Sequence, residues 1–197
     1  MPNHAPAAPP ELLLGSASKY RAELLARLRL GFRAVPSAVD ETPLAGEAPH
    51  ALARRLSVAK ARAVQVGAPQ AWILGSDQTA VVAGRITGKP GGRVQQIEQL
   101  QCASGQTVEF LTGLALLTPA GLYEGLDVTT VRFRRLSQAE IEHYVDAEPA
   151  YDCAGGFKCE GLGISLFDAI ESTDPTGLVG LPLILTHRLL RDAGYPF

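Results

Sequence analysis

Two charged residues near the middle of the chain stand in settings suited to chemistry. Asp77 follows the apolar run of residues 71–74, and Lys89 occupies a Gly-Lys-Pro turn a short distance later. A carboxylate at the end of a buried strand seldom lacks a cation or a hydrogen-bond partner. The pattern therefore predicts that Asp77 is a metal ligand or a base, beside a lysine able to hold a polyphosphate. The competing interpretation is an ordinary surface turn.

A second candidate anion site lies near the start of the chain. The apolar residues 12–14 end at a Gly-Ser pair, and Ser18 then stands where it can cap a helix that we expect to reach Gly31. The first N–H groups of a helix are unpaired and its dipole favours phosphate there. Ser16, Ser18 and Arg21 would supply the side chains. Taken alone, such a pattern is more often a simple helix cap.

Several other kinds of site are excluded by spacing. The glycines around Lys89 are one residue short of a P-loop, and Pro90 stands where a Ser or Thr should hold magnesium. The three cysteines have neither zinc-ligand spacing nor a histidine pair beside them. No histidine is placed as in a nucleophile–histidine triad. We expect the cysteines and histidines to be structural or surface residues.

Composition points to one compact domain with a small-molecule ligand. The 197 residues are 46% hydrophobic and carry a net charge of -2, so no basic field is available for a nucleic acid. An odd number of cysteines suits a reduced, cytoplasmic setting. We expect a disordered tail over residues 1–11, no signal peptide, no membrane-spanning segment and a single domain over residues 12–197.

Helical and strand patterns alternate along the chain. Helices are expected after Pro49, with Lys60 beside its apolar stripe, around residues 94–100, from a Ser137 capping box to Tyr144, and from residue 181 to 194. Strands are expected at residues 71–74, 79–82, 85–87, 108–117, 123–133 and 164–170. This alternation, with long antiparallel pairs, predicts a mixed α/β or α+β fold.

From about Leu12 to Gly194 the chain resembles the Maf family of nucleoside triphosphate pyrophosphatases. The resemblance is carried by residues 14–21, 75–78, 86–90 and 153–161. It implies an elongated mixed β-sheet flanked by helices, with two lobes around a central cleft as in inosine triphosphate pyrophosphatases. It also implies a hydrolase acting on an acid anhydride, a nucleoside triphosphate as its substrate, and a homodimer as an expectation from the family.

The resemblance assigns roles to five residues. Asp77 matches the proton acceptor, and Glu41 matches a second acid that helps to hold a divalent cation, Mg²⁺ or Mn²⁺. Lys60, Lys89 and Arg21 match residues that face the phosphates. From the residues alone, a lysine beside an apolar helix stripe more often extends to water. Where the family has Ser-Pro-Arg-Arg, this chain has a lysine for the proline and an alanine for the second arginine.

Three further positions separate the branches of the family. Tyr20, Gln78 and Glu160 resemble the branch that acts on 7-methyl-GTP, whereas the dTTP and UTP branch has arginine, threonine and glutamine there. An aromatic ring and a carboxylate suit the positive charge of an N7-methylated guanine. Without the resemblance, Tyr20 packing on its helix and Glu160 on a loop surface is an equal interpretation. The alternatives are the dTTP/UTP activity or a non-catalytic regulator of septum formation.

Overall fold

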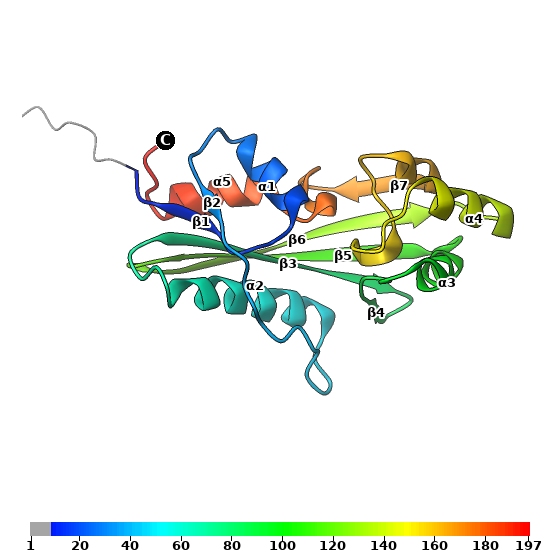
Figure 1. Cartoon of the computed structure of the whole chain (residues 1–197), viewed down its shortest axis with the longest axis horizontal. Coiled ribbons are helices and arrows are strands. Elements are labelled where there is room, and N and C mark those ends of the chain that lie inside the picture. Colours follow the sequence, from blue (N-terminus) through cyan, green and yellow to red (C-terminus); the bar gives the residue numbers. More distant parts are fainter. Residues whose placement is uncertain (1–8) are drawn as a thin grey trace, which may run out of the picture.

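The structure, a computed structural model, describes residues 9–197, so residues 1–8 of the expected tail lie outside the described part. Seven strands form one mixed sheet in the order β2-β1-β3-β5-β6-β7, with β4 paired to β3 (Figure 1). The mixed α/β expectation is confirmed. The strands are β1 (Leu12–Leu14), β2 (Arg33–Ala34), β3 (Trp72–Val82), β4 (Arg85–Thr87), β5 (Thr107–Thr118), β6 (Gly121–Phe133) and β7 (Phe167–Ser172).

Helices cover both faces of one half of the sheet (Figure 1). In β1 and β3, Leu13 and Ile73 pack against α2, while Leu14 and Leu74 point to the opposite face and pack with α1 and α5. Successive strand side chains alternate between faces, so two adjacent leucines can serve two different layers. The helices of the described residues are α1 (Lys19–Ala26), α2 (Pro49–Gln65), α3 (Arg93–Ala103), α4 (Gln138–Ala147) and α5 (Leu183–Asp192).

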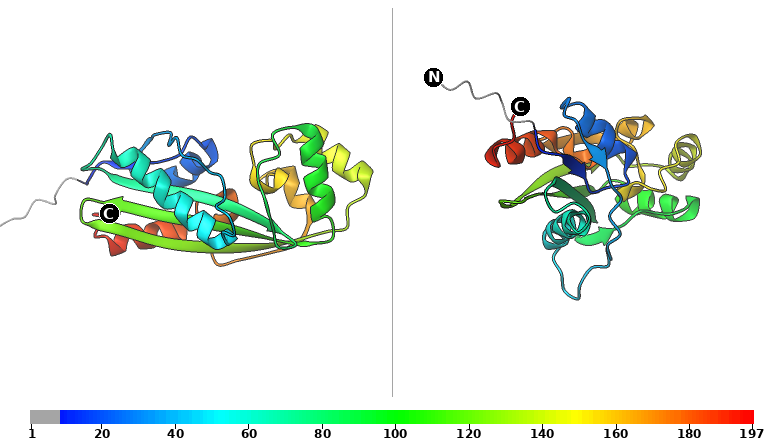
Figure 2. Two further views of the ribbon diagram at one scale, coloured as in Figure 1. Left: turned by 90° about the horizontal axis from the view of Figure 1, so that it is seen from below. Right: turned by 60° about the vertical axis from the view of Figure 1, so that its left-hand side comes forward.

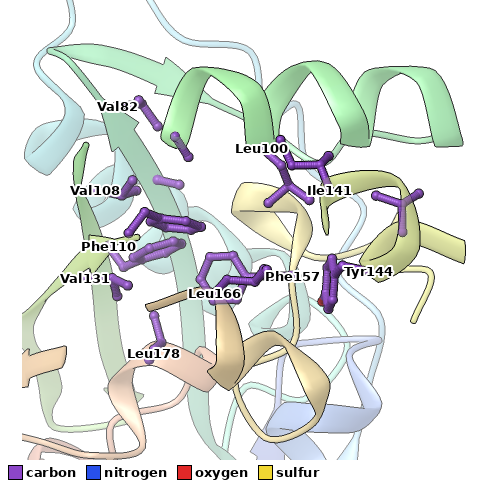
Figure 3. Close-up of a cluster of buried hydrophobic side chains, with 14 residues drawn as sticks. Val82, Leu100, Val108, Phe110, Val131, Ile141, Tyr144, Phe157, Leu166 and Leu178 are labelled. Carbon is purple, nitrogen blue, oxygen red and sulfur yellow. The ribbon is translucent and has the colours of Figure 1, made fainter. Parts of the chain in front are cut away.

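The other half of the molecule has its own core. Helices α3 and α4 and the loops of residues 150–166 pack on the far ends of β3, β5 and β6 (Figure 2). At its centre, Phe157 meets Phe110 edge-on with 5.4 Å between ring centroids (Figure 3). Phe157 meets Phe133 in the same manner. Such edge-to-face pairs stabilise a core beyond their buried area. The three long strands therefore connect a first lobe (α1, α2 and α5) to a second lobe (α3, α4 and these loops).

Strand β3 differs from its predicted form. Residues 71–74 and 79–82 were expected to be separate strands, but one strand runs without a break from Trp72 to Val82. Its whole length from Ile73 to Val82 pairs with β5, and this pairing overrides the local turn tendency of the Gly-Ser-Asp sequence. Asp77 consequently lies in the middle of a strand and not at its end.

The outer edge of β3 carries two short partners with a gap between them. β1 pairs with residues 72–74 and β4 with residues 80–82, which leaves residues 75–79 between these two pairings. An interrupted sheet edge lets side chains approach the strand from the side. Asp77 is at the centre of this interval.

Helix α2 lies unusually close to the sheet because two glycines face it. A Cβ on Gly75 would collide with the Ser57 carbonyl, and one on Gly113 would collide with the Ala53 carbonyl. Any larger residue at either position would push the helix outward. The close approach brings Lys60, on the same helix face, down to β3.

Other predicted elements are confirmed with shifted ends. The Ser137 capping box is present, and α4 continues beyond Tyr144 to Ala147. Helix α1 ends at Ala26, short of the expected Gly31, and is followed by turns. The expected strand at residues 164–170 begins as a 3-10 helix, and β7 starts only at residue 167. Glu11, placed in the tail by the sequence, accepts a hydrogen bond at its backbone carbonyl from the Trp72 N–H at 2.8 Å.

None of the helices described is long and apolar enough to cross a membrane.

Candidate active site

All ten residues singled out in the sequence line one cavity between the two lobes, with a volume of about 1000 Å³. They come from α1, α2, β3 and four loops, so only the tertiary structure brings them together. The ten are Ser16, Ser18, Tyr20, Arg21, Glu41, Lys60, Asp77, Gln78, Lys89 and Glu160.

Lys60 lies between the two predicted acids. Its Nζ atom is 2.6 Å from Asp77 Oδ1 and 2.6 Å from Glu41 Oε1. Lys60 is only 6% exposed, so the interpretation of a lysine that extends to water is wrong. The partner carboxylates and the close packing of α2 on β3 make this burial possible, since an unpaired buried ammonium would be strongly destabilising.

Burial and the charge of Lys60 shift the pKa of each acid in opposite directions. Burial raises the pKa of Asp77, and the charge and hydrogen bond of Lys60 only partly offset this effect. Partial burial also raises the pKa of Glu41, but there the hydrogen bond and charge of Lys60 prevail, and the pKa falls below its usual value. Asp77 is thus the better proton acceptor, while Glu41 remains ionised to lower pH.

The carboxylates fit a hard divalent cation. One oxygen of Glu41 and one of Asp77 both lie 2.6 Å from the same nitrogen, so a single cation of similar size can contact both. Within residues 9–197 no group of three potential His, Cys, Asp or Glu ligands is gathered. Mg²⁺ commonly binds through one or two carboxylates and completes its coordination with water and substrate phosphates. The donor set therefore suits a metal that arrives with a nucleotide.

The serine loop before α1 forms a compact polar corner. Ser18 caps the helix by accepting a hydrogen bond from the Arg21 N–H at 3.4 Å, as predicted. Ser16 Oγ accepts from the Ser18 N–H at 3.1 Å and from Arg21 Nη1 at 3.4 Å. The start of α1 and a guanidinium therefore face the same cavity, which favours an anion.

Arg21 is held in place by its contacts. Its Nε donates to the Gly180 carbonyl at 2.9 Å, and Nη1 to Ser16. Burial lowers the pKa of Arg21, while the charges of Asp77 and Glu41 act to raise it. An arginine stays protonated even so, and it places a fixed positive charge in the cavity. Lys89, in contrast, is exposed on the rim and reaches the cavity from the loop after β4.

Another part of the cavity lining is aromatic and acidic. Tyr20 and Glu160 line it together with Asp152, and burial raises the pKa of Tyr20, so its phenol stays neutral. Lys19 Nζ lies 5.1 Å from the centroid of the Tyr20 ring, so this ring face already accepts a cation. The Cys159 thiol donates to Glu160 Oε2 at 3.5 Å. A flat, positively charged group suits this part of the cavity.

Gln78 lines the cavity, and its amide nitrogen is hydrogen-bonded to the protein itself. Its Nε2 donates to the carbonyls of Gly177 at 2.9 Å and Leu178 at 3.2 Å, and lies 3.0 Å from Thr112 Oγ1. Backbone carbonyls only accept, so the amide must present its NH₂ group to them. The side-chain donors are consequently occupied by the protein, and only Oε1 is left for a ligand.

Two residues important for the shape of the site were missed from the sequence. Ser76 Oγ donates to the Gly180 carbonyl at 2.9 Å, and Gln96 is fully buried, where its Nε2 donates to the Gly156 carbonyl at 2.8 Å. Both contacts span more than 50 residues of sequence, so no local pattern could have revealed them. The only sequence indication was a polar residue within an apolar periodic segment.

Comparison with known proteins agrees with this geometry. A sequence profile described as Maf-like protein matches residues 11–193, which is nearly the whole chain. The chain belongs to the Maf family. Among other Maf proteins, one from Xanthomonas oryzae pv. oryzae named 7-methyl-GTP pyrophosphatase is 58% identical, covering 94% of this chain and 98% of that protein.

A more distant Maf relative shows the same agreement. A Burkholderia pseudomallei protein, also named 7-methyl-GTP pyrophosphatase, is 50% identical, covering 100% of this chain and 93% of that one. Among solved structures, the Staphylococcus aureus Ham1 protein aligns with a TM-score of 0.47 and 13% sequence identity. The alignment covers 64% of this chain and 72% of that chain, and the likeness is too slight to support an inference.

Proposed function

We propose that this Maf protein hydrolyses 7-methyl-GTP to 7-methyl-GMP and pyrophosphate. The observation that carries the proposal is that one cavity has two chemically different groups of side chains in its lining. One part of its lining, which we call the phosphate end, has a lysine that joins two carboxylates, Asp77 and Glu41. Another part, which we call the base end, has the aromatic ring of Tyr20 and the carboxylate of Glu160. A triphosphate and a cationic base would each find complementary groups. The names of the full-length relatives support the same substrate.

At the phosphate end, Asp77 would accept the proton of the attacking water. Its raised pKa makes it a better base than an ordinary aspartate. Glu41 and Asp77 would hold the cation, and a bound Mg²⁺ or Mn²⁺ would neutralise phosphate oxygens and acidify the water. Lys60 contacts both carboxylates and orients them, and its ammonium group would also face the phosphates.

Arg21 and Lys89 would take up the charge of the leaving pyrophosphate. Arg21 is fixed by two hydrogen bonds from its own side chain, so its positive charge requires little reorganisation during the reaction. Lys89 lines the cavity from the loop after β4, where an exposed lysine can close on a bound triphosphate. Together they would favour cleavage between the α- and β-phosphates.

At the base end, Tyr20 and Glu160 would select a positively charged purine. A ring that attracts the Lys19 ammonium can also attract a cationic base, and such a cation–π contact is worth about 0.5–2 kcal/mol. Glu160 keeps one oxygen beyond its contact with Cys159, and a carboxylate can accept from the N1–H and amino groups of guanine. An unmethylated guanine would lose the charge contribution from both residues.

The test is a panel of triphosphates assayed for pyrophosphate release by purified protein with magnesium. We expect 7-methyl-GTP to have the highest kcat/KM, well above those of GTP, dTTP and UTP. A preference for dTTP or UTP would assign the protein to the sister activity. Absence of turnover on every nucleotide would favour the non-catalytic regulatory alternative.

A further inference from the structure

The turn formed by residues 177–180 lies directly behind Arg21. Its last carbonyl, that of Gly180, accepts hydrogen bonds from Arg21 Nε and from Ser76 Oγ, both at 2.9 Å. Gly180 has a φ of 104°, a backbone conformation that favours glycine, and a Cβ there would come within 3.4 Å of Arg21 Nε. The position of this carbonyl therefore determines where the guanidinium points.

The first carbonyl of the same turn is held from the sheet. Gly177 O accepts from Gln78 Nε2 at 2.9 Å and from Thr112 Oγ1 at 3.2 Å. Gln78 also donates to Leu178 O, and Thr112 Oγ1 accepts from the Gln78 amide at 3.0 Å. The two side chains come from adjacent strands β3 and β5, where they are direct register partners. They form a small closed network beneath the turn.

Asp174 fixes the other side of the turn to α5. Its Oδ1 accepts from the N–H and the hydroxyl of Thr176, and its Oδ2 accepts from the N–H groups of Ile184 at 2.6 Å and Leu185 at 3.3 Å. A carboxylate that caps a helix in this way is a strong anchor. The turn is thus attached to a helix on one side and to the sheet on the other.

We propose that Thr112 is a positioning residue for Arg21 and acts with Gln78 through the turn of residues 177–180. The proposal rests on the role of Arg21 as a phosphate ligand in the proposed function. Thr112 is fully buried and is not among the described residues that line the cavity, so it acts only through its neighbours. Gln78 then influences activity mainly by supporting the phosphate end, and less by direct contact with a base.

The proposal separates catalytic efficiency from base choice. A turn that loses its support would let Arg21 move, and this would weaken stabilisation of the leaving group for every triphosphate alike. The ratio of kcat/KM values for 7-methyl-GTP and GTP would stay the same. A direct role in base recognition would instead change that ratio.

Thr112→Val tests the network, because valine keeps the shape of threonine and removes only the hydroxyl. We expect kcat/KM to fall about 10-fold on all triphosphates, the order of effect of one buried hydrogen bond. Thr112→Ser should restore most of the activity. Thr118→Val, an equally drastic change of a buried threonine on the same strand but in the β5–β6 turn, should leave kcat/KM unchanged.

A double-mutant cycle identifies Arg21 as the residue through which Thr112 acts. In an Arg21→Ala background, Thr112→Val should cause no further loss of kcat/KM, because its target has been removed. The proposal would be overturned if the double variant lost kcat/KM by the product of the two single-variant losses. A changed ratio of kcat/KM values for 7-methyl-GTP and GTP would also overturn it. Thermal unfolding of each variant shows whether lost stability alone explains a fall in activity, and a loss matched by unfolding at assay temperature also counts against it.

The measurement uses whichever triphosphate the parent protein hydrolyses best, so the two proposals can fail separately. One result would be that the parent protein prefers another nucleotide while Thr112→Val causes no further loss in the Arg21→Ala background. That result would refute the proposed substrate and support the positioning role. If the parent has no turnover, the dissociation constant of inorganic triphosphate replaces kcat/KM in the same cycle. A parent that does not bind inorganic triphosphate would overturn both proposals.

Discussion

The ammonium nitrogen of Lys60 lies 2.6 Å from Asp77 Oδ1, and both residues are only 6% exposed. The pair joins the middle of α2 to the middle of β3, where two glycines let the helix approach the sheet. Each charge compensates the burial of the other. The same pair also tunes the carboxylate that we assign to proton transfer, so its members should have separable effects on activity.

Asp77→Asn should lower kcat by about two orders of magnitude or more, because it removes the charge that accepts a proton and holds a cation while keeping the shape of the side chain. The fold should survive, since Lys60 retains its pairing with Glu41. Steady-state kinetics and thermal unfolding measure both effects. Asp168→Asn, at an exposed position on β7, serves as the control. Activity within a few-fold of the parent would show that another group is the base.

Lys60→Gln should move the acidic limb of the pH–rate profile to higher pH. Burial already raises the pKa of Asp77, and Lys60 opposes that rise, so loss of its charge raises the pKa further. A base is active when deprotonated, and its activity is lost as the pH falls through its pKa. Lys60→Arg keeps the charge and should leave the limb near its parental position. An unshifted limb in Lys60→Gln would mean that Asp77 does not titrate in the rate-limiting step.

Removal of divalent cations should abolish turnover, and either Mg²⁺ or Mn²⁺ should restore it. Glu41→Gln removes one of the two proposed carboxylate ligands, so the metal concentration for half-maximal rate should rise about 10-fold or more. Titration of metal into chelator-treated protein measures this constant. Glu47→Gln changes an acid just before α2 that pairs with Arg55 and does not line the cavity, and it should leave this metal concentration unaltered. Full activity in chelator would contradict the metal assignment.

Hydrolysis in heavy-oxygen water should place the label on the monophosphate, because the water is proposed to attack the α-phosphorus. Mass spectrometry of the two products reads this directly. Label confined to pyrophosphate would mean attack at the β-phosphorus, and Arg21 and Lys89 would then not stabilise a leaving pyrophosphate.

Glu160→Gln should narrow the preference for 7-methyl-GTP over GTP by about 10-fold, because it removes a negative charge beside the cationic ring and keeps a polar contact. The ratio of kcat/KM values for the two substrates is the relevant measurement. Glu171→Gln, an exposed residue on β7, provides a matched control that should not change the ratio. If GTP and 7-methyl-GTP are equally good substrates of the parent, Glu160 has no charge-selective role.

Local chemistry in the sequence was sufficient to predict several features of the structure. Ser18 caps α1 and Ser137 forms its capping box with Glu140, as their spacing indicated, because such contacts involve residues within one turn. The strand-like residues 108–117 and 123–133 likewise predicted the long β5–β6 pair, which extends slightly beyond those bounds. The family resemblance, carried by short motifs, assembled the ten candidate residues that line the cavity.

The tertiary structure decided what those residues contact. Asp77 lies inside a strand because β5 pairs along all of β3, and Lys60 is buried because glycines on two strands admit α2. Gln78 turns its amide toward residues 177 and 178, which are about 100 positions away in sequence. Long-range packing and hydrogen bonding set these arrangements, and local propensity carries no information about which distant carbonyl or carboxylate a side chain will meet.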